Sequence, residues 1–388
     1  MTPESRNSDC SHRADVAVIG GGIVGLAFAW EAAKCGLRVV LFERDSRAQG
    51  ASIRNFGMIW PIGQPQGIWY ECALRSRDRW LELKDHAKIW VAECGSLHLA
   101  HADDELAILQ EFLTQSQQHD LPFQLLSPAE TIRRFPAVNP ERLQGAMYSP
   151  VEACVDPRQA IAMISNYLAE QYRVNIRYNT SISTVEMPYL RTACGEVWQV
   201  ERCIVCGGAE FATLYPKVWA ESGMRRCKLQ MMRSAPQPNN WRLGTHIAGG
   251  LTLGHYRAFE SCPTLTSFKS RIATELPDYV RYGIHVMASQ NHLGEIVIGD
   301  SHEYDGSVTP FDKAIIDNFI LSYLRTLVHL PDWSIESRWH GIYIKHPTET
   351  VFESQPQPNC HIIGSPGGAG MTLSFGFAER WWKNHISQ

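Results

Sequence analysis

The apolar runs near the start of the chain predict a strand, a helix and a second strand. Residues 16–19 form a short buried-strand run, and a glycine-rich turn then leads into an apolar helical stretch that ends near Lys34. Gly36 is expected to cap this helix, and residues 38–42 form the second strand. The chain therefore opens with a βαβ unit, from which parallel sheets are built.

The rest of the chain mixes helical and strand-like periodicity. Further helices are predicted at residues 66–90, 103–118, 157–172 and 311–328 and after residue 370. Strands are predicted at 174–178, 181–185, around Thr192 and Trp198, at 201–206 and at 360–364, with short β-like runs dominating 225–345.

Three glycine-rich turns from strand to helix, near residues 20, 207 and 367, suggest that one sheet is assembled from separate parts of the sequence. The segments between them do not look doubly wound. We predict an α/β protein with two interleaved domains. The Rossmann-like domain is expected at 14–75, 150–215 and 336–388, and an antiparallel substrate-binding domain at 76–149 and 216–335.

Composition and charge exclude several classes of protein. The 388 residues are 44% hydrophobic and 20% charged, as in ordinary globular proteins. With 36 Lys and Arg against 40 Asp and Glu, the net charge of −4 leaves no basic excess for nucleic acid. No apolar stretch is long enough to span a bilayer, and the first 13 residues are polar, without a secretory signal. We expect a cytoplasmic protein without a membrane or nucleic-acid partner.

Cysteine and histidine give no metal or disulfide pattern. The 11 cysteines are scattered without framework spacing, which indicates reduced thiols. Cys203 and Cys206 have the spacing of a redox or zinc motif, but no second pair accompanies them, so buried structural thiols are expected. The 15 histidines form no paired ligand motif, and no metal site is predicted.

The first turn satisfies the dinucleotide fingerprint G-x-G-x-x-G. Gly20 allows the tight turn, Gly22 lets the backbone approach a pyrophosphate, and Gly25 lets helix and strand pack closely. The helix that begins near Ile23 offers free N–H groups to the phosphates. Glu43, at the end of the second strand, would accept hydrogen bonds from ribose and repel a 2′-phosphate. The ligand is therefore FAD or NAD(H) rather than NADP.

Several motifs together resemble the FAD enzyme family of D-amino acid oxidase, glycine oxidase and sarcosine oxidase. The motifs are the βαβ unit, Gly-Ala-Ser-Ile-Arg-Asn-Phe-Gly-Met at 50–58, Val-Asp-Pro-Arg at 155–158, Cys-Gly-Gly-Ala at 206–209, Gly-Glu-Ile-Val-Ile-Gly at 294–299 and Gly-Gly-Ala-Gly-Met-Thr-Leu at 367–373. They occur in the family's order over nearly the whole chain. The resemblance implies an FAD-binding domain of the glutathione-reductase type.

Carried over position by position, the resemblance implies a set of FAD-binding residues: Gly20, Gly22, Ile23, Val24, Glu43, Arg44, Ser52, Arg54, Asn55, Gly57, Met58, Ile182, Gly207, Gly208, Gly341, Gly368, Gly370, Met371 and Thr372. The helix start at 368–372 would offer N–H groups to the flavin C2 carbonyl, and a positive helix end stabilises a reduced flavin. Sarcosine oxidase's flavin-attaching cysteine falls on Gly341, which implies non-covalent FAD.

The chain departs from the family at the substrate's carboxylate. The arginine that grips it in D-amino acid and glycine oxidases is replaced by Tyr343, and the lysine that compensates in sarcosine oxidase is replaced by Thr372. These replacements disfavour a standard α-amino acid substrate. The candidates for binding an anionic substrate are Arg54, Met58, Arg338 and Lys345, and those for orienting the amine are His255, Tyr256 and Tyr343.

The segments at 52–58, 228–233, 251–256 and 368–375 resemble a subgroup associated with aminophosphonate breakdown. This resemblance implies oxidation of 2-aminoethylphosphonate, or its N-methyl or hydroxy derivative, to an aldehyde and ammonia or methylamine, with O₂ as electron acceptor. Two alternatives stay open. One is a glycine, sarcosine or D-amino acid oxidase, or a dehydrogenase that passes electrons to a quinone or partner protein. The other is a flavin-binding subunit without its own turnover. Both a monomer and a homo-oligomer fit the sequence.

Overall fold

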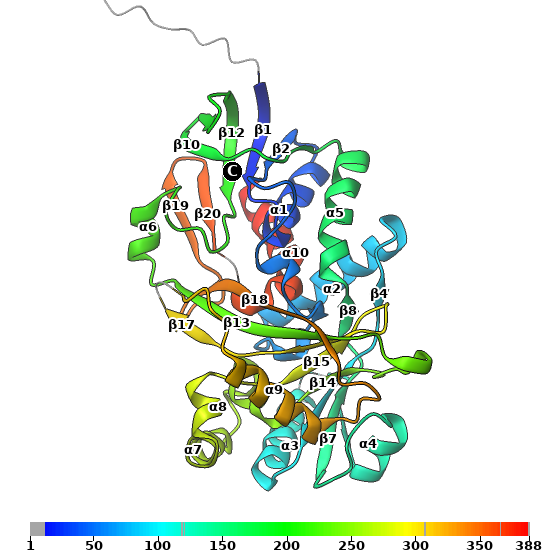
Figure 1. Cartoon of the computed structure of the whole chain (residues 1–388). Coiled ribbons are helices and arrows are strands. Elements are labelled where there is room, and N and C mark those ends of the chain that lie inside the picture. The colour runs from blue at the N-terminus through cyan, green and yellow to red at the C-terminus, as the bar shows by residue number, and fades with distance from the viewer. Residues whose placement is uncertain (1–11, 118, 120, 306–307, 365, 387–388) are drawn as a thin grey trace, which may run out of the picture.

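The computed structural model describes residues 12–117, 119, 121–305, 308–364 and 366–386. Figure 1 shows two regions, one above and one below the long strands β13 (Arg225–Ser234) and β18 (Ile335–Lys345). Cys10 and most of the polar N-terminal stretch lie outside the described residues. Among the described helices, none combines the length and apolar character needed to cross a bilayer.

The upper region is built on a mainly parallel sheet. Its central strands run in the order β12 (Val197–Val205), β1 (His12–Ile19), β2 (Val39–Phe42) and β9 (Asn175–Arg177), and β20 (Cys360–Ile363) pairs parallel to β12. Antiparallel strands complete it: β10 (Ile182–Glu186), β11 (Tyr189–Thr192) and β19 (Glu353–Gln357). All four residues of β2 are buried, as expected for a strand in a parallel sheet covered on both faces.

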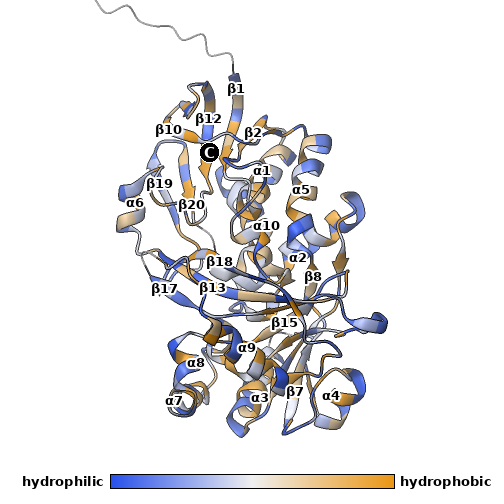
Figure 2. Cartoon of the chain, in the orientation of Figure 1, coloured by the Kyte–Doolittle hydropathy of each residue, from blue (hydrophilic) through white to orange (hydrophobic). Residues whose placement is uncertain are grey.

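Four helices pack with this sheet around its largest apolar core. They are α1 (Ile23–Lys34), α2 (Ile68–His86), α5 (Pro157–Tyr172) and α10 (Gly370–His385). Three tryptophans are fully buried in this core: Trp30, Trp80 and Trp382. The indole N–H of Trp382 donates to the Phe28 carbonyl at 3.0 Å, which fixes the C-terminal helix against α1. Hydrophobic residues line β1, β2 and β20 in Figure 2.

The lower region holds a second, mostly antiparallel sheet. Its strands follow the order β17 (Glu303–Asp305), β13, β16 (Ile296–Gly299), β15 (Met287–Gln290), β14 (His246–Ala248), β5 (Ser96–Ala100), β7 (Gly145–Ser149) and β6 (Gln124–Leu126), and β18 pairs with β13. The helices here are α3 (Asp103–Gln117), α4 (Pro128–Arg134), α7 (Leu265–Glu275), α8 (Pro277–Arg281) and α9 (Ala314–Leu327). A small sheet joins β3 (Met58–Ile59), β8 (Ala153–Val155) and β4 (Val91–Ala92), and α6 (Pro216–Glu221) precedes β13.

Among the differences from the expected pattern, two concern residues 225–345. Residues 225–345 contain α7 and α8 besides the single helix that was expected. Strand β18 pairs with β13 of the second sheet along its length, although residues 336–345 were assigned to the FAD-binding domain. The other domain boundaries stay a prediction.

Candidate functional site

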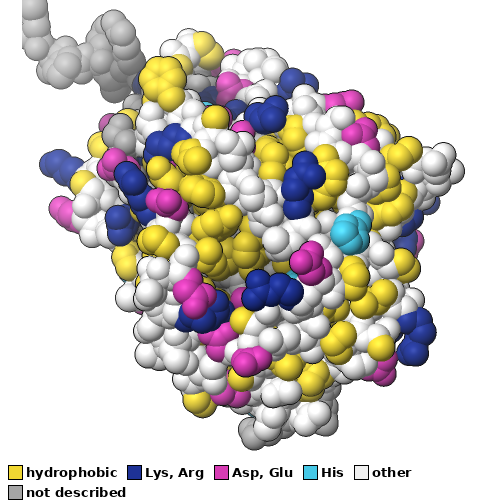
Figure 3. All heavy atoms as spheres, turned by 60° about the horizontal axis from the view of Figure 1, so that its bottom comes forward, with side chains coloured by type: hydrophobic (Ala, Val, Ile, Leu, Met, Phe, Trp, Pro, Cys, Tyr) yellow, Lys and Arg dark blue, Asp and Glu magenta, His cyan; other side chains and the backbone are white. Residues whose placement is uncertain are grey.

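A cavity of about 710 Å³ lies between the two sheets. One end is lined by the residues that follow the parallel strands, namely Gly20 after β1, Glu43 after β2 and Cys206 after β12. In open parallel sheets, ligands bind in the crevice outside these carboxyl ends. The other end is lined from β18 and by residues of the second sheet. Figure 3 shows a face on which hydrophobic side chains surround a hollow, with Lys and Arg side chains at its edges.

The first glycine turn leaves no room for side chains. A Cβ on Gly20 would lie 2.3 Å from the Cys206 carbonyl oxygen, and one on Gly25 would lie 1.9 Å from the Gly20 carbonyl oxygen. Gly20 also has φ +112°, in the region that favours glycine. A Cβ on Gly22 would lie 2.9 Å from Ser52 Oγ. The turn is thus packed tightly against the sheet and brings backbone to the cavity wall, as the fingerprint predicts.

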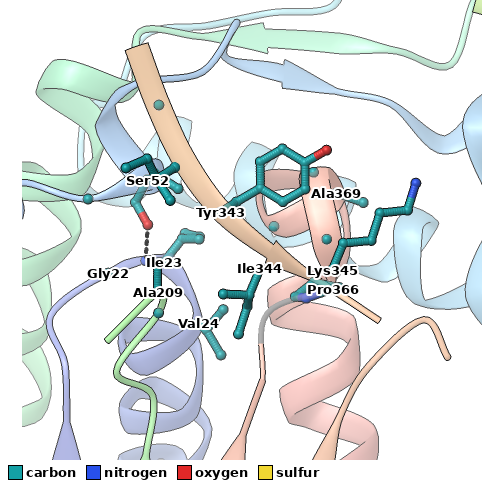
Figure 4. Close-up of a pocket in the computed structure, with 18 of the residues that line it drawn as sticks. Gly22, Ile23, Val24, Ser52, Ala209, Tyr343, Ile344, Lys345, Pro366 and Ala369 are labelled. Carbon is teal, nitrogen blue, oxygen red and sulfur yellow. Dashed lines mark hydrogen bonds between the residues drawn. The ribbon is translucent and has the colours of Figure 1, made fainter. Parts of the chain in front are cut away.

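Hydrogen bonds fix the polar groups around this turn. The backbone N–H of Ile23 donates to Ser52 Oγ at 2.9 Å (Figure 4). The buried Glu43 carboxylate accepts the N–H of Gly21 at 2.8 Å and that of Asp45 at 3.0 Å. Each carboxylate oxygen keeps a further acceptor site, which is available to a ribose hydroxyl.

The C-terminal turn places a helix start at the cavity. Helix α10 begins at Gly370, and no side chain caps it. Thr372 Oγ1 accepts the N–H of Trp60 at 2.9 Å, and the indole N–H of Trp80 donates to the Met371 carbonyl at 2.9 Å. A Cβ on Gly368 would lie 3.7 Å from the Tyr343 ring, so this turn adjoins β18. The positive end of α10 is therefore held firmly against the cavity.

Strand β18 supplies the cavity wall next to this helix start. Tyr343 and Lys345 project from the same side of the strand (Figure 4). Burial raises the pKa of Tyr343 well above its usual value and lowers that of Lys345. Lys345 is half-buried, and among the described residues it forms no ion pair or hydrogen bond. The wall thus carries a phenol and an ammonium without an acidic partner.

A cluster of polar residues lies beside this wall. The rings of His255 and His285 are 3.9 Å apart, and those of His255 and His302 are 4.4 Å apart. Asp300 Oδ1 lies 3.3 Å from His285 Nε2. Burial lowers the pKa of His302 to about 4 and raises the pKa of Asp300 well above its usual value. Sequence reasoning selected His255 but missed the other three residues. No local sequence motif marks these three residues, because it is the pairing of strands far apart in the sequence that brings them together.

Most of the expected site residues line the cavity. All the proposed FAD-binding residues except Gly57 do so, as do Tyr343, His255, Tyr256, Arg54, Lys345 and Met58. Gly57 serves packing instead, because a Cβ there would lie 2.0 Å from the Val155 carbonyl oxygen. Arg54 lines the cavity, but its guanidinium also donates to the His340 carbonyl at 3.2 Å.

Arg338 was predicted to bind substrate, and the structure places it elsewhere. It lies on β18 an odd number of residues from Tyr343, so its side chain leaves the opposite face of the strand. There its guanidinium pairs with Asp317 of α9 at 3.1 Å. Within the described residues the cysteines are free, and Cys203 and Cys206 are both buried.

Comparison with known proteins places the chain in a family. The model of the DAO family, described as FAD dependent oxidoreductase, matches residues 15–380. The chain belongs to the DAO family of FAD-dependent oxidoreductases. The glycine turns, Glu43 and the open start of α10 fit FAD, because they offer backbone N–H groups, a ribose acceptor and a positive helix end to it.

The DAO chain is similar to curated oxidases and dehydrogenases. It is 27% identical to glycine oxidase of Geobacillus kaustophilus over 218 residues, 54% of this chain and 58% of that protein. It is 27% identical to mitochondrial sarcosine dehydrogenase of Mus musculus over 161 residues, 40% of this chain and 17% of that protein. It therefore spans less than two thirds of either relative.

Two further likenesses cover most of the DAO chain. It is 21% identical to one of the subunits of opine oxidase from Rhizobium meliloti over 349 residues, 86% of this chain and 83% of that protein. The crystal structure of the Geobacillus kaustophilus glycine oxidase superposes with a TM-score of 0.77 at 20% identity, covering 97% of this chain and 95% of that one. The second likeness concerns the fold.

Proposed function

We propose that the protein is an FAD-dependent amine oxidase for a small amine that carries an anionic group. The proposed substrate is 2-aminoethylphosphonate or its N-methyl or hydroxy derivative. The observation that carries the proposal is Lys345, a half-buried cavity lysine that forms no ion pair with any described residue and, among carboxylates, feels only a longer-range attraction from Glu260. A buried ammonium without a counter-ion is costly, and an anionic substrate would supply that counter-ion.

Three features of the cavity support this substrate class. Tyr343 takes the place of the arginine that grips a carboxylate in D-amino acid and glycine oxidases, so a different anion is favoured. Arg54 and Arg257 add cationic groups to the same cavity. A phosphonate offers three oxygens that can accept hydrogen bonds from several separate donors, whereas a carboxylate suits bidentate hydrogen bonding by one arginine.

The proposed reaction depends on the cofactor and on the apolar character of the cavity. When bound, FAD would accept a hydride from the carbon that bears the amine. His255, Tyr256 and Tyr343 are proposed to orient the amine, and burial favours its uncharged form, which is the form that reacts. The resulting imine takes up water and releases an aldehyde and ammonia or methylamine. O₂ is the proposed final acceptor, giving H₂O₂.

Anaerobic reduction of the flavin tests the proposal. The FAD-loaded protein is mixed with 2-aminoethylphosphonate, its N-methyl form, glycine, sarcosine and D-alanine in turn, and the loss of oxidised-flavin absorbance is followed. The phosphonates are expected to reduce the flavin fastest. Faster reduction by any of the three amino acids would show that the substrate assignment is wrong.

Two other functions are each favoured by a particular observation. A glycine or sarcosine enzyme is supported by the similarity to glycine oxidase and sarcosine dehydrogenase, and the same panel of amines distinguishes it. A flavin subunit without its own turnover is supported by the likeness to a subunit of opine oxidase, and it predicts that no amine reduces the flavin. The reduced flavin of an oxidase is reoxidised rapidly in air, whereas that of a dehydrogenase needs a quinone or a protein as electron acceptor.

A further inference from the structure

The cluster of His255, His285, His302 and Asp300, here called the histidine–aspartate cluster, includes three residues, His285, His302 and Asp300, to which the proposed amine oxidation gives no role. Each of its histidines offers a ring nitrogen, and these nitrogens lie within 4.8 Å of one another. All four residues line the cavity. His285 and Asp300 are 3% and 5% exposed, so water does not readily satisfy their polar atoms.

Hydrogen bonding assigns the tautomer of one histidine. His302 Nδ1 lies 2.9 Å from the Gly283 carbonyl oxygen, which can only accept a hydrogen bond. In the neutral ring Nδ1 therefore carries the proton, and Nε2 presents a lone pair. His302 Nε2 lies 3.9 Å from Asp300 Oδ2. Donation of the other ring N–H to a backbone carbonyl is the outer-shell arrangement of metal-binding histidines.

The remaining polar atoms of the cluster lack partners. Both ring nitrogens of His285 and the Oδ1 of Asp300 are buried without a hydrogen bond among the described residues. Buried polar atoms of this kind are costly and are normally satisfied by a partner, a water or an ion. A proton on Asp300 would give it one donor and would satisfy one acceptor. A metal ion would satisfy the carboxylate and the imidazole lone pairs together.

We propose that the histidine–aspartate cluster binds a divalent transition-metal ion of the Zn²⁺ class. Three neutral imidazoles and one carboxylate suit Zn²⁺ or Fe²⁺ and do not suit Mg²⁺ or Ca²⁺, which take oxygen ligands. Ligand atoms about 2.1 Å from a tetrahedral metal lie about 3.4 Å apart. The 3.3 Å between His285 Nε2 and Asp300 Oδ1 matches this spacing, whereas the histidine nitrogens lie within 4.8 Å of one another and would have to move closer to bind one ion. This site contrasts with the prediction from sequence that no metal is bound.

The positive charge of Lys345 is expected to disfavour metal binding at the cluster. Burial lowers the pKa values of His255, His285 and His302, and the nearby ammonium of Lys345 lowers them further. This keeps the rings neutral, as ligands must be. The positive charge of Lys345 also repels a metal ion in the cluster. Removing that charge is therefore expected to tighten metal binding.

A second histidine group provides an internal comparison. Glu353, His361 and His385 also bring ligand atoms within 4.8 Å of one another. The carboxylate of this group is exposed and already engaged, because Glu353 Oε1 accepts the indole N–H of Trp381 at 2.6 Å and lies 3.4 Å from His361 Nδ1. We expect the metal at the histidine–aspartate cluster and not at this group.

Zn²⁺ binding to the FAD-loaded protein tests the proposal without any substrate. The purified protein is treated with a chelator and titrated with Zn²⁺ in a calorimeter, and metal content is measured after dialysis. His285→Ala and Asp300→Asn are expected to weaken binding by about 100-fold or more, since even outer-shell partners contribute 10–100-fold. Asp300→Asn keeps the size of the side chain, so it tests the site even if His285→Ala does not fold. Retained FAD absorbance shows that a variant is folded. Lys345→Met is expected to bind Zn²⁺ more tightly.

The controls are two histidines outside the cluster. His346 lines the same cavity, and His361 belongs to the second group. His346→Ala and His361→Ala are expected to bind one Zn²⁺ per chain as the parent does. Absence of Zn²⁺ binding, binding that survives in His285→Ala and Asp300→Asn, or binding lost only in His361→Ala would overturn the proposal. Flavin reduction by amines is measured separately, so the proposed function can fail while the metal site holds, and the reverse.

Discussion

Replacing Lys345 with methionine tests the anion site most directly. Methionine keeps an unbranched, flexible side chain of similar length and removes the charge. Hydrogen bonds to charged groups contribute about 1.5–3 kcal/mol. Lys345 is half-buried and without an acidic partner among the described residues, so little of its interaction with an anion is shared with other groups. Since 1.4 kcal/mol corresponds to about tenfold, Lys345→Met is expected to weaken binding of an anionic substrate about 10- to 150-fold.

Ethylphosphonate, an anion without an amine, allows this binding to be measured apart from turnover. Its Kd is obtained from the change that it causes in the flavin spectrum. Burial lowers the pKa of Lys345, so the charged form is lost as pH rises through that lowered value. The Kd of the parent protein should therefore rise at a lower pH than the usual lysine value, and the Kd of Lys345→Met should lack this step.

A matched control separates this effect from a change in overall charge. Lys217 is exposed on α6 and does not line the cavity, so Lys217→Met should leave the Kd unchanged. If Lys345→Met binds ethylphosphonate as tightly as the parent does, the assignment of Lys345 to the anion is wrong. An equal loss in Lys217→Met would instead indicate long-range electrostatics.

Three other substitutions probe the framework. Gly25→Ala would place a Cβ 1.9 Å from the Gly20 carbonyl oxygen and should abolish FAD retention. The control Gly50→Ala, whose Cβ would meet nothing within 4 Å, should retain FAD. Equal flavin content in the two purified variants would refute the packing argument. Lys228 is fully buried and donates to the Thr309 carbonyl at 3.0 Å beside Asp312, so Lys228→Ala should lower the free energy of unfolding in urea by about 3 kcal/mol, and a loss below about 1 kcal/mol would contradict this. Burial raises the pKa of the Glu152 carboxyl in the folded state. The folded protein therefore holds this proton at pH values where the unfolded chain has lost it. As pH rises above the pKa of the unfolded chain, Glu152 lowers the free energy of unfolding. Glu152→Gln should therefore stabilise the protein more at pH 7.5 than at pH 4.5, and a pH-independent difference in melting temperature would count against it.

The FAD end of the site could be predicted from sequence because its information is local. Gly20, Gly22, Gly25 and Glu43 lie within one βαβ unit, and the structure shows the close contacts that their spacing implies. Strand alternation likewise pairs Tyr343 with Lys345. The same alternation excludes Arg338 from that face, so this error could have been avoided from the sequence.

The far end of the site could not be predicted in the same way. His255 precedes α7, His285 precedes β15, and Asp300 and His302 follow β16. Antiparallel pairing of β15 with β16 and of β16 with β13 brings them together. Such register is set by packing of the whole sheet, and no short spacing encodes it. The short helices α7 and α8 were missed because the strand-like runs around them dominate the pattern.

Strand β18 divides its residues between two tasks. Tyr343 and Lys345 lie on its cavity side, while Arg338 and His340 on its other side pair with Asp317 and Asp312. Substitutions at the cavity positions can therefore alter which substrates are accepted while the contacts with Asp317 and Asp312 that anchor the strand stay in place. This separation makes β18 a natural target for directed evolution of substrate range. A one-residue insertion within it would exchange the two faces and destroy both properties at once.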